Sequence, residues 1–271
     1  MEILQAIILG IVQGASEFLP ISSSGHLILV PKLFGWTGVV DSLSFDVALH
    51  LATSLAVIVY FWSDWVRLLK AFLASFPKGI GAIWKNNDAR IFVLLIVGSI
   101  PAAIFGYLFQ DIVEEKNRNT SLVALLLIIF ALVLLAAEKI GKKNRSQNSL
   151  GIVDSLLIGV AQAVAIFPGV SRSGITISTG LFRNLTRAEA ARFSFMLSTP
   201  IILGVALLRS KDIFTGASDG SMLVFVTGFI AAAVSSWLAI KFLLSFIQTR
   251  SFTVFVVYRI LLGLTLLFIT L

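Results

Sequence analysis

The sequence predicts an all-α, polytopic membrane protein made of two repeats with inverted topology. Each repeat is expected to hold a re-entrant helical hairpin followed by three transmembrane helices, which gives six spans in all. The first reason is composition, because the 271 residues are 58% hydrophobic and 13% charged, with a mean hydropathy of +0.98, values typical of helical membrane proteins. The second is an internal repeat, in which residues 10–26 align without gaps on residues 159–175 at an offset of 149. We therefore expect a single membrane domain.

Composition also excludes several kinds of site. The chain has no cysteine, which excludes disulfides, thiolate metal sites and cysteine nucleophiles. The net charge of +7 resides mainly in short loops between apolar segments, which is the positive-inside pattern of membrane proteins. We therefore expect no nucleic-acid partner.

The first repeat, about residues 1–138, begins with the apolar segments 3–16 and 23–35. Each is too short to cross a bilayer alone, because a spanning helix needs about 20 apolar residues. Together they predict a hairpin that enters the membrane and returns. Spans are predicted at about 44–62, 91–110 and 120–138, with a cytoplasmic amphipathic segment at 63–90 and an acidic turn at 111–118.

A basic, polar linker at about residues 139–151 is the best internal boundary. The second repeat, about 152–271, then has a hairpin at about 152–182 and spans at about 187–208, 221–245 and 252–270. A hairpin returns to the side it left and three spans do not. The second repeat must therefore be upside down relative to the first.

The charge distribution agrees with this topology. The segments predicted inside, 63–90, 138–151, 183–192 and 241–250, hold 14 of the 21 Lys and Arg residues, as the positive-inside rule requires. The segments predicted outside hold five: Lys32, Lys116, Arg118, Arg209 and Lys211. Both termini are then expected outside. Arg172 and Arg259 lie in apolar sequence, where each is expected to need an anionic partner.

Polar residues concentrate in the first hairpin, where a membrane environment makes them costly. Gln13 and Glu17 are four apart and share a helix face, and Pro20 breaks that helix. A second helix is expected to begin within a polar run: Ser22, Ser23, Ser24, Gly25 and His26. Because a helix N-terminus in a low-dielectric setting binds anions, these groups favour phosphoester or phosphoanhydride chemistry. The alternative is an interfacial helix with an ordinary serine cap.

The second hairpin carries a related run, Pro168-Gly-Val-Ser-Arg-Ser-Gly-Ile-Thr176. Two hairpins that enter from opposite faces bring their tips together, so both second half-helices direct their positive N-termini at one place. Arg172 adds a planar fork that suits a phosphate, and the pocket is expected to bind an anion with more than one charge. In the alternative interpretation, Arg172 merely pairs with Glu17 across the repeat axis.

These residues carry a family resemblance. Gln13-x-x-x-Glu17 with the following Ser-Ser-Ser-Gly-His, and the nine-residue run from Pro168 to Thr176, resemble the two signature motifs of the undecaprenyl-diphosphate phosphatases of the bacitracin-resistance type. The resemblance covers essentially the whole chain. It implies dephosphorylation of undecaprenyl diphosphate in the bacterial plasma membrane, which recycles the lipid carrier for peptidoglycan and other wall polymers. It also implies divalent-cation dependence and an active site open to the outer, periplasmic face.

The same resemblance places the family's functional residues on Glu17, Ser23, His26 and Arg172. The first motif often has Glu or Gln at its first position, which is Gln13 here, so a mechanism that needs two carboxylates is weakened.

The chemistry of the residues fits independently. Ser23 is expected to attack phosphorus with His26, one turn on, as its base, and His26 as nucleophile is the alternative. Glu17 and the Gln13 carbonyl offer hard oxygen ligands for Mg²⁺ or Ca²⁺. The diphosphate is expected to be held by Arg172 and by small residues at the two helix starts: Ser22, Ser24, Gly25, Ser171, Ser173, Gly174 and Thr176.

The competing function is transport, because inverted repeats with broken helices also build transporters. A polyprenyl-phosphate flippase would need much the same pocket, but a nucleophile with an adjacent base favours the enzyme. The expected partner is a polyprenyl diphosphate lipid, and a homodimer stays open. Asp46 and His50, one turn apart, are either a supporting pair behind the site or an ordinary helix start.

Overall fold

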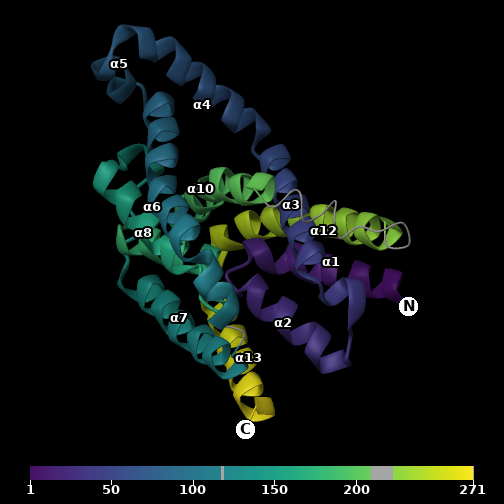
Figure 1. The fold of residues 1–271 in the computed structure, drawn as a ribbon. Coiled ribbons are helices and arrows are strands. Elements are labelled where there is room, and N and C mark those ends of the chain that lie inside the picture. Colours follow the sequence, from purple (N-terminus) through teal and green to yellow (C-terminus); the bar gives the residue numbers. More distant parts are fainter. Residues whose placement is uncertain (117–118, 209–221, 271) are drawn as a thin grey trace.

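Residues 1–116, 119–208 and 222–270 are described by a computed structural model (Figure 1). Every regular element within these ranges is helical, and no strand forms among them. The prediction of an all-α protein is therefore confirmed. Of the predicted outside cations, Arg118, Arg209 and Lys211 fall outside the described residues.

The first half of the chain follows the expected order. The predicted hairpin becomes two helices, the spans become three longer ones, and the amphipathic segment becomes two short helices with a 3-10 turn between them. The elements are α1 (Glu2–Phe18), α2 (Ser23–Phe34), η1 (Gly38–Asp41), α3 (Leu43–Tyr60), α4 (Trp62–Ser75), η2 (Phe76–Lys78), α5 (Ile80–Lys85), α6 (Asn87–Lys116) and α7 (Thr120–Ile140).

In the second half, the described residues again form a helix pair followed by three longer helices. Its described elements are η3 (Gln147–Ser149), α8 (Ile152–Val164), α9 (Arg172–Phe182), α10 (Arg187–Leu208), α12 (Met222–Thr249) and α13 (Thr253–Thr270).

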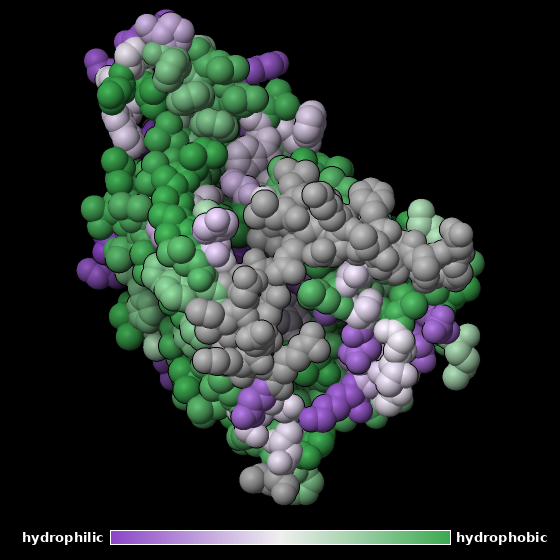
Figure 2. Space-filling model, in the orientation of Figure 1, coloured by the Kyte–Doolittle hydropathy of each residue, from purple (hydrophilic) through white to green (hydrophobic). Residues whose placement is uncertain are grey.

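Five of the described helices are long and apolar enough to cross a membrane: α3, α6, α7, α12 and α13. The sixth predicted span, at 187–208, forms the helix α10 but is not among these five. Its first two turns carry Arg187, Glu189 and Arg192, which shorten its apolar stretch. Its middle carries the buried Ser194 and Ser198, so this helix runs through the interior of the protein. Hydrophobic side chains cover the surface of α6 in Figure 2, as expected for a helix that faces lipid.

The two hairpins turn in the same way. Leu19 leaves α1 in an extended conformation, and Pro20 cannot continue a helix. Ser22 then caps α2 with φ 73°, and Ser171 caps α9 with φ 69°. Such values are rare for a residue with a side chain, and each costs on the order of 1–3 kcal/mol. Because these serines lie at the repeat offset of 149, the repeat extends to an unusual backbone geometry.

The helices of the two halves are interleaved. The first helix of the first hairpin, α1, packs along α12, and the corresponding helix of the second hairpin, α8, packs along α6 (Figure 1). At both crossings glycines meet, with Gly10 against the carbonyl of Gly228 and Gly159 against that of Gly98. Small residues let helix backbones approach closely in membranes. The third spans, α7 and α13, also pack together.

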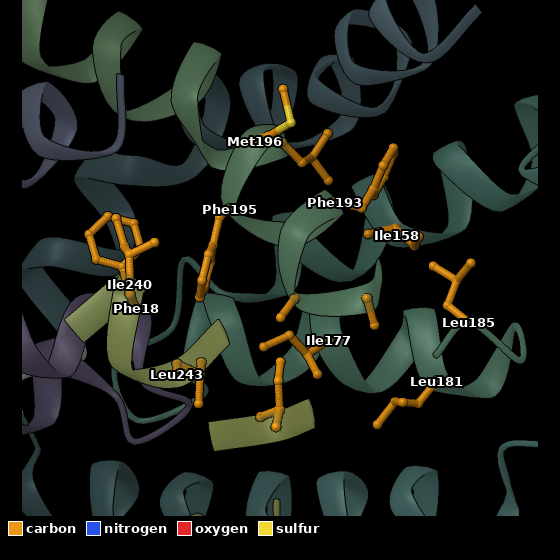
Figure 3. Close-up of a cluster of buried hydrophobic side chains, with 14 of the residues drawn as sticks. Phe18, Ile158, Ile177, Leu181, Leu185, Phe193, Phe195, Met196, Ile240 and Leu243 are labelled. Atoms are coloured by element: carbon orange, nitrogen blue, oxygen red, sulfur yellow. The ribbon is translucent and has the colours of Figure 1, made fainter. Parts of the chain in front are cut away.

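A large hydrophobic cluster supports the hairpin tips from one side (Figure 3). Phe18, the last residue of α1, packs edge-on against Phe195 of α10, with ring centroids 5.3 Å apart and planes at 83°. Ile177 of α9 belongs to the same cluster. The residues next to both tips are thereby fixed in one packed core.

Ion pairs bind the linker to the loop after α9. Arg145 and Arg183 both bond the buried carboxylate of Asp154, at 2.9 and 2.5 Å. Burial favours a raised pKa for Asp154, but the bonds from Arg145, the Gly151 N–H and Arg183 outweigh it and hold the pKa below its usual value. The segment at 63–90 joins this end through Arg192, which pairs with Asp64 at 2.5 Å.

Hydrogen bonds to hydroxyl groups connect segments at the opposite end. Lys32, after the first hairpin, donates to the Thr120 hydroxyl at the start of α7 at 3.1 Å. Ser121 lies 3.3 Å from Thr270 at the end of α13. The segments predicted inside therefore meet one another, and segments predicted outside do the same.

Candidate active site

The tips of the two hairpins meet. The Ser173 hydroxyl donates to the Leu19 carbonyl at 3.1 Å, and the Gly169 N–H donates to the Ser24 hydroxyl at 3.4 Å. Helix α2 begins at Ser23 and α9 at Arg172, so two helix N-termini lie at this junction. The first N–H groups of a helix carry partial positive charge. The junction is therefore suited to an anion.

Glu17 is the centre of the junction. Its buried carboxylate accepts from Arg172 Nη2 at Oε1 (2.5 Å), and at Oε2 from the Ser23 hydroxyl (2.6 Å) and Gln13 Nε2 (3.1 Å). His50 of α3 places its Nε2 3.8 Å from Oε2. Both hairpins and the first span thus contribute to one carboxylate.

The small residues predicted to hold a diphosphate occupy matching positions in the two tips. The Ser22 and Ser24 hydroxyls lie 3.3 Å apart, and those of Ser171 and Ser173 lie 3.4 Å apart. Ser171 also accepts from the Gly174 N–H at 3.2 Å.

Two of the predicted positions, Thr176 and Gly25, differ from the others. Thr176 donates to the Arg172 carbonyl and lies 2.6 Å from the Ser194 hydroxyl of α10, so its hydroxyl is directed into the protein. A Cβ on Gly25 would meet Leu127 at an ordinary distance of 3.7 Å, and Gly25 is therefore not required by space.

His26 is bonded on both ring nitrogens. Nδ1 lies 2.7 Å from the Ser22 carbonyl, and Nε2 lies 2.6 Å from the hydroxyl of Tyr258 in α13. The Ser23 hydroxyl is instead bonded to Glu17. That His26 accepts the Ser23 proton stays a prediction, and in this arrangement the acceptor at hand is Glu17.

Within the described residues, Arg259 has no anionic partner of the kind that its sequence position suggested. Its side chain is fully buried, and Nη2 donates to the carbonyls of Gly169 and Val170, at 2.9 Å each. Nε and Nη1 have no partner among the described residues. A Cβ on Gly174 would lie 2.8 Å from Nη1, so glycine is needed there. Backbone carbonyls replace a carboxylate because Arg259 lies under the turn of the second hairpin.

The family model described as "Bacitracin resistance protein BacA" matches residues 6–265. The chain belongs to this family. Among curated relatives, the "Undecaprenyl-diphosphatase" of Desulforudis audaxviator is 46% identical over 271 residues, covering 100% of this chain and 99% of the relative. The protein of the same name from Moorella thermoacetica is 47% identical over 263 residues, covering 97% and 96%. The resemblance inferred from the two motifs is thereby confirmed.

The donor set of this BacA-family protein fits a divalent cation in part. The Oε1 atom of Gln13 is buried beside Glu17 and has no partner among the described residues. Both Glu17 oxygens are already engaged, and no cluster of three His, Asp or Glu forms within the described ranges. A cation here would take Gln13, Glu17 and oxygens of the substrate, which is the usual arrangement for Mg²⁺.

Two contributors to the site of this BacA-family protein escape both motifs. The sequence left two interpretations of His50 and Asp46 open, a supporting pair or an ordinary helix start. The position of His50 beside Glu17 favours a supporting role for His50. Tyr258 had no signal, because one tyrosine in an apolar span is common. The contact with His26 joins residues 232 positions apart, which no local pattern reveals.

Proposed function

We propose that this BacA-family protein is an integral-membrane phosphatase that hydrolyses undecaprenyl diphosphate to undecaprenyl phosphate and inorganic phosphate. This reaction recycles the lipid carrier for cell-wall synthesis. The observation that carries the proposal is the Ser23 hydroxyl, bonded to Glu17 at 2.6 Å, at the junction of two helix N-termini and beside Arg172. Full-length relatives named undecaprenyl-diphosphatase support it.

The first step is attack by Ser23 on the terminal phosphorus. The Oγ–P bond forms, the bond from phosphorus to the bridging oxygen breaks, and its electron pair leaves with undecaprenyl phosphate. The Ser23 proton passes to Glu17. Such a transfer depends mainly on positioning and on neutralising the phosphoryl oxygens, for which the α2 and α9 N-termini lie in place.

Arg172 is proposed to change partners when the diphosphate binds. In the structure its guanidinium pairs with Glu17 at 2.5 Å. A diphosphate carries more charge and can accept a two-pronged hold. Transfer of Arg172 to the substrate frees a Glu17 oxygen at the moment when Glu17 is needed as a base. Arg172 then pairs with Glu17 before the diphosphate binds and holds the diphosphate afterwards, so both interpretations of this residue apply in turn.

The second step is hydrolysis of the phosphoseryl intermediate. Water attacks phosphorus, the P–Oγ bond breaks, and Ser23 recovers its proton from Glu17. His26 is the proposed acceptor for the proton of that water. Ser23 is thus the nucleophile of the first step, and His26 is the base of the second.

A divalent cation, Mg²⁺ or Ca²⁺, would neutralise phosphoryl oxygens when bound. Gln13 and Glu17 are its proposed ligands, supported by the unpartnered Gln13 Oε1. Replacement of Gln13 by Ala is expected to raise the cation concentration needed for half-maximal activity, measured by titrating metal into chelator-treated protein. An unchanged titration would remove Gln13 from the ligand set.

The proposed topology has six spans in two inverted repeats, α10 being the sixth, with both termini and the site opening on the periplasmic side. Support comes from the interleaved glycine contacts of α1 with α12 and α8 with α6, and from the linker ion pairs gathered with Arg192 and Asp64 at one end. The prenyl chain stays in lipid between spans.

One labelling experiment tests the function. Purified protein is given undecaprenyl diphosphate labelled on its terminal phosphate, and both released phosphate and protein-bound label are measured. We expect phosphate release and acid-stable label on Ser23, both abolished in Ser23→Ala and retained in Ser121→Ala. A flippase would release no phosphate, which would overturn the proposal. Acid-labile label on His26, with Ser23→Ala still turning over, would overturn the Ser23 assignment alone.

A further inference from the structure

The His26 ring has one partner from its own hairpin and one from the last helix of the chain. Tyr258 of α13 places its hydroxyl 2.6 Å from Nε2. The two rings are parallel within 3°, with centroids 5.7 Å apart. The next residue, Arg259, is bonded to the turn of the second hairpin through Gly169 and Val170. One turn of α13 therefore fixes Tyr258 relative to both hairpins.

These contacts define which nitrogen of His26 carries its proton. A carbonyl oxygen can only accept a hydrogen bond, so the 2.7 Å contact with Ser22 requires a proton on Nδ1. In the neutral ring, Nε2 then has a lone pair and no hydrogen. The Tyr258 hydroxyl must donate to that lone pair, because Nε2 has nothing to donate. After His26 gains a proton, the same hydroxyl oxygen can accept from Nε2.

We propose that Tyr258 is a positioning residue for the hydrolytic step, an inference that rests on the function proposed above. Its hydroxyl donates to the basic Nε2 of His26 and connects that nitrogen to the attacking water. As water attacks the phosphoseryl phosphorus, a water proton moves to the Tyr258 oxygen and the Tyr258 proton moves to Nε2. Tyr258 is unchanged, and His26 ends as imidazolium until it releases the proton to solvent.

The hydroxyl, and not the ring alone, carries this role. Phenylalanine would preserve the parallel ring contact, and half of the tyrosine surface is already free of packing. Tyr258→Phe therefore removes one hydrogen bond with little change in shape. Tyr107→Phe on α6, where the tyrosine is 85% exposed, is the matched control.

The chain contains two histidines, which makes a direct measurement practical. Protein with ¹⁵N-labelled histidine is examined by NMR, with His50→Gln used for assignment. We expect His26 to be protonated at Nδ1 and free of hydrogen at Nε2 in both wild type and Tyr258→Phe, because the Ser22 carbonyl sets that tautomer. We expect the Nε2 resonance to shift in Tyr258→Phe, where the hydrogen bond from the tyrosine is lost. A wild-type His26 protonated at Nε2 would overturn the proposal even if Tyr258→Phe failed to fold.

Enzyme kinetics provide a second test of the role of Tyr258. In Tyr258→Phe we expect kcat to fall on the order of 100-fold with KM little changed, and the phosphoseryl label to accumulate because its hydrolysis is the slowed step. Tyr107→Phe should match wild type. An unchanged kcat, or a loss without accumulated label, would overturn the inference. Failure of the wild type itself to release phosphate would instead overturn the proposed function, while the tautomer measurement would still test the Tyr258 contact.

Discussion

Arg172 and Glu17 form a buried ion pair that joins the two hairpins, at 2.5 Å between Nη2 and Oε1. Buried pairs contribute little net stability because both charges lose their hydration. A pair that adds little stability is readily exchanged for another anion. In the mechanism that we propose, the pair keeps Arg172 extended toward the junction before substrate arrives.

Arg172→Lys tests this view of the guanidinium. We expect kcat/KM to fall by about 100-fold or more, because an ammonium cannot hold a phosphate in two-pronged fashion and removal of one preorganised donor costs on that scale. The protein should still fold, as checked by its melting temperature in detergent. Near-native turnover would demote Arg172 to a structural partner of Glu17.

At the residue level, the candidate site residues that lie in the two repeated segments could be predicted from the sequence. Glu17, Ser23 and Arg172 stood out because polar groups cluster in apolar sequence. The nearest partner of Ser23 could not be predicted, since Ser23 is one turn from His26 along the helix but bonds across the turn to Glu17. The broken helix, and not helical spacing, decides that contact.

The glycine crossings govern how closely the helices approach. A Cβ on Gly159 would lie 2.9 Å from the Gly98 carbonyl carbon and closer still to its oxygen. The helix α8 would have to move away from α6, and the second hairpin tip would move with it.

We expect Gly159→Ala to destabilise the protein by about 1–3 kcal/mol, the range for overpacking a close contact. Gly106→Ala on α6 is the control, because a Cβ there meets nothing within 4 Å. That variant should be neutral or more stable by about 0.5–1 kcal/mol, since alanine favours a helix. Reversible unfolding in mixed micelles measures both, and equal effects would contradict the close-approach argument.

At the element level, apolar length and proline placement predicted the two pairs of short helices and the five helices that are long and apolar enough to cross a membrane. The structure extends α6 to Asn87–Lys116 and α12 to Met222–Thr249, beyond the predicted ends at 91–110 and 221–245. Polar ends can continue a helix past the apolar stretch, so hydropathy marks the part within lipid and not the helix itself. The same reasoning explains α10, whose polar residues are buried against protein.

The linker cluster makes the stability of the whole molecule depend on pH. Bonds from Arg145 and Arg183 hold the pKa of Asp154 below its ordinary value, and the unfolded chain titrates near the ordinary aspartate pKa of about 3.9. The stabilisation from Asp154 is therefore present above that pH and is lost as pH falls through the lower, folded pKa.

We expect the melting temperature of wild type to exceed that of Asp154→Asn at pH 7, and the gap to close as the pH is lowered below about 4. Thermal unfolding in detergent at a series of pH values measures this. A gap that stays constant down to pH 3 would show that the charge of Asp154 is not what binds the linker.

Topology is tested by labelling single cysteines, which the cysteine-free chain makes simple. An impermeant reagent on intact cells should label cysteines at positions of Asn117 and Ser218, which lie outside the described residues, and should fail to label them at Lys78 and Asn144. Permeabilised cells provide the control, since all four should then react. Asn117 and Asn144 on the same side would contradict the inverted repeat.

The packing of α1 along α12 also sets an order of events during synthesis. The ribosome delivers α1 to the membrane first, and its closest companion is nearly the last helix to be made. Until α12 is made, Gly10 has no Gly228 to meet, and until α9 is made, Glu17 has no Arg172. The first hairpin is therefore inserted before its long-range partners exist, and of the described partners of Glu17 only those in the first repeat, Gln13, Ser23 and His50, are then available to hold it.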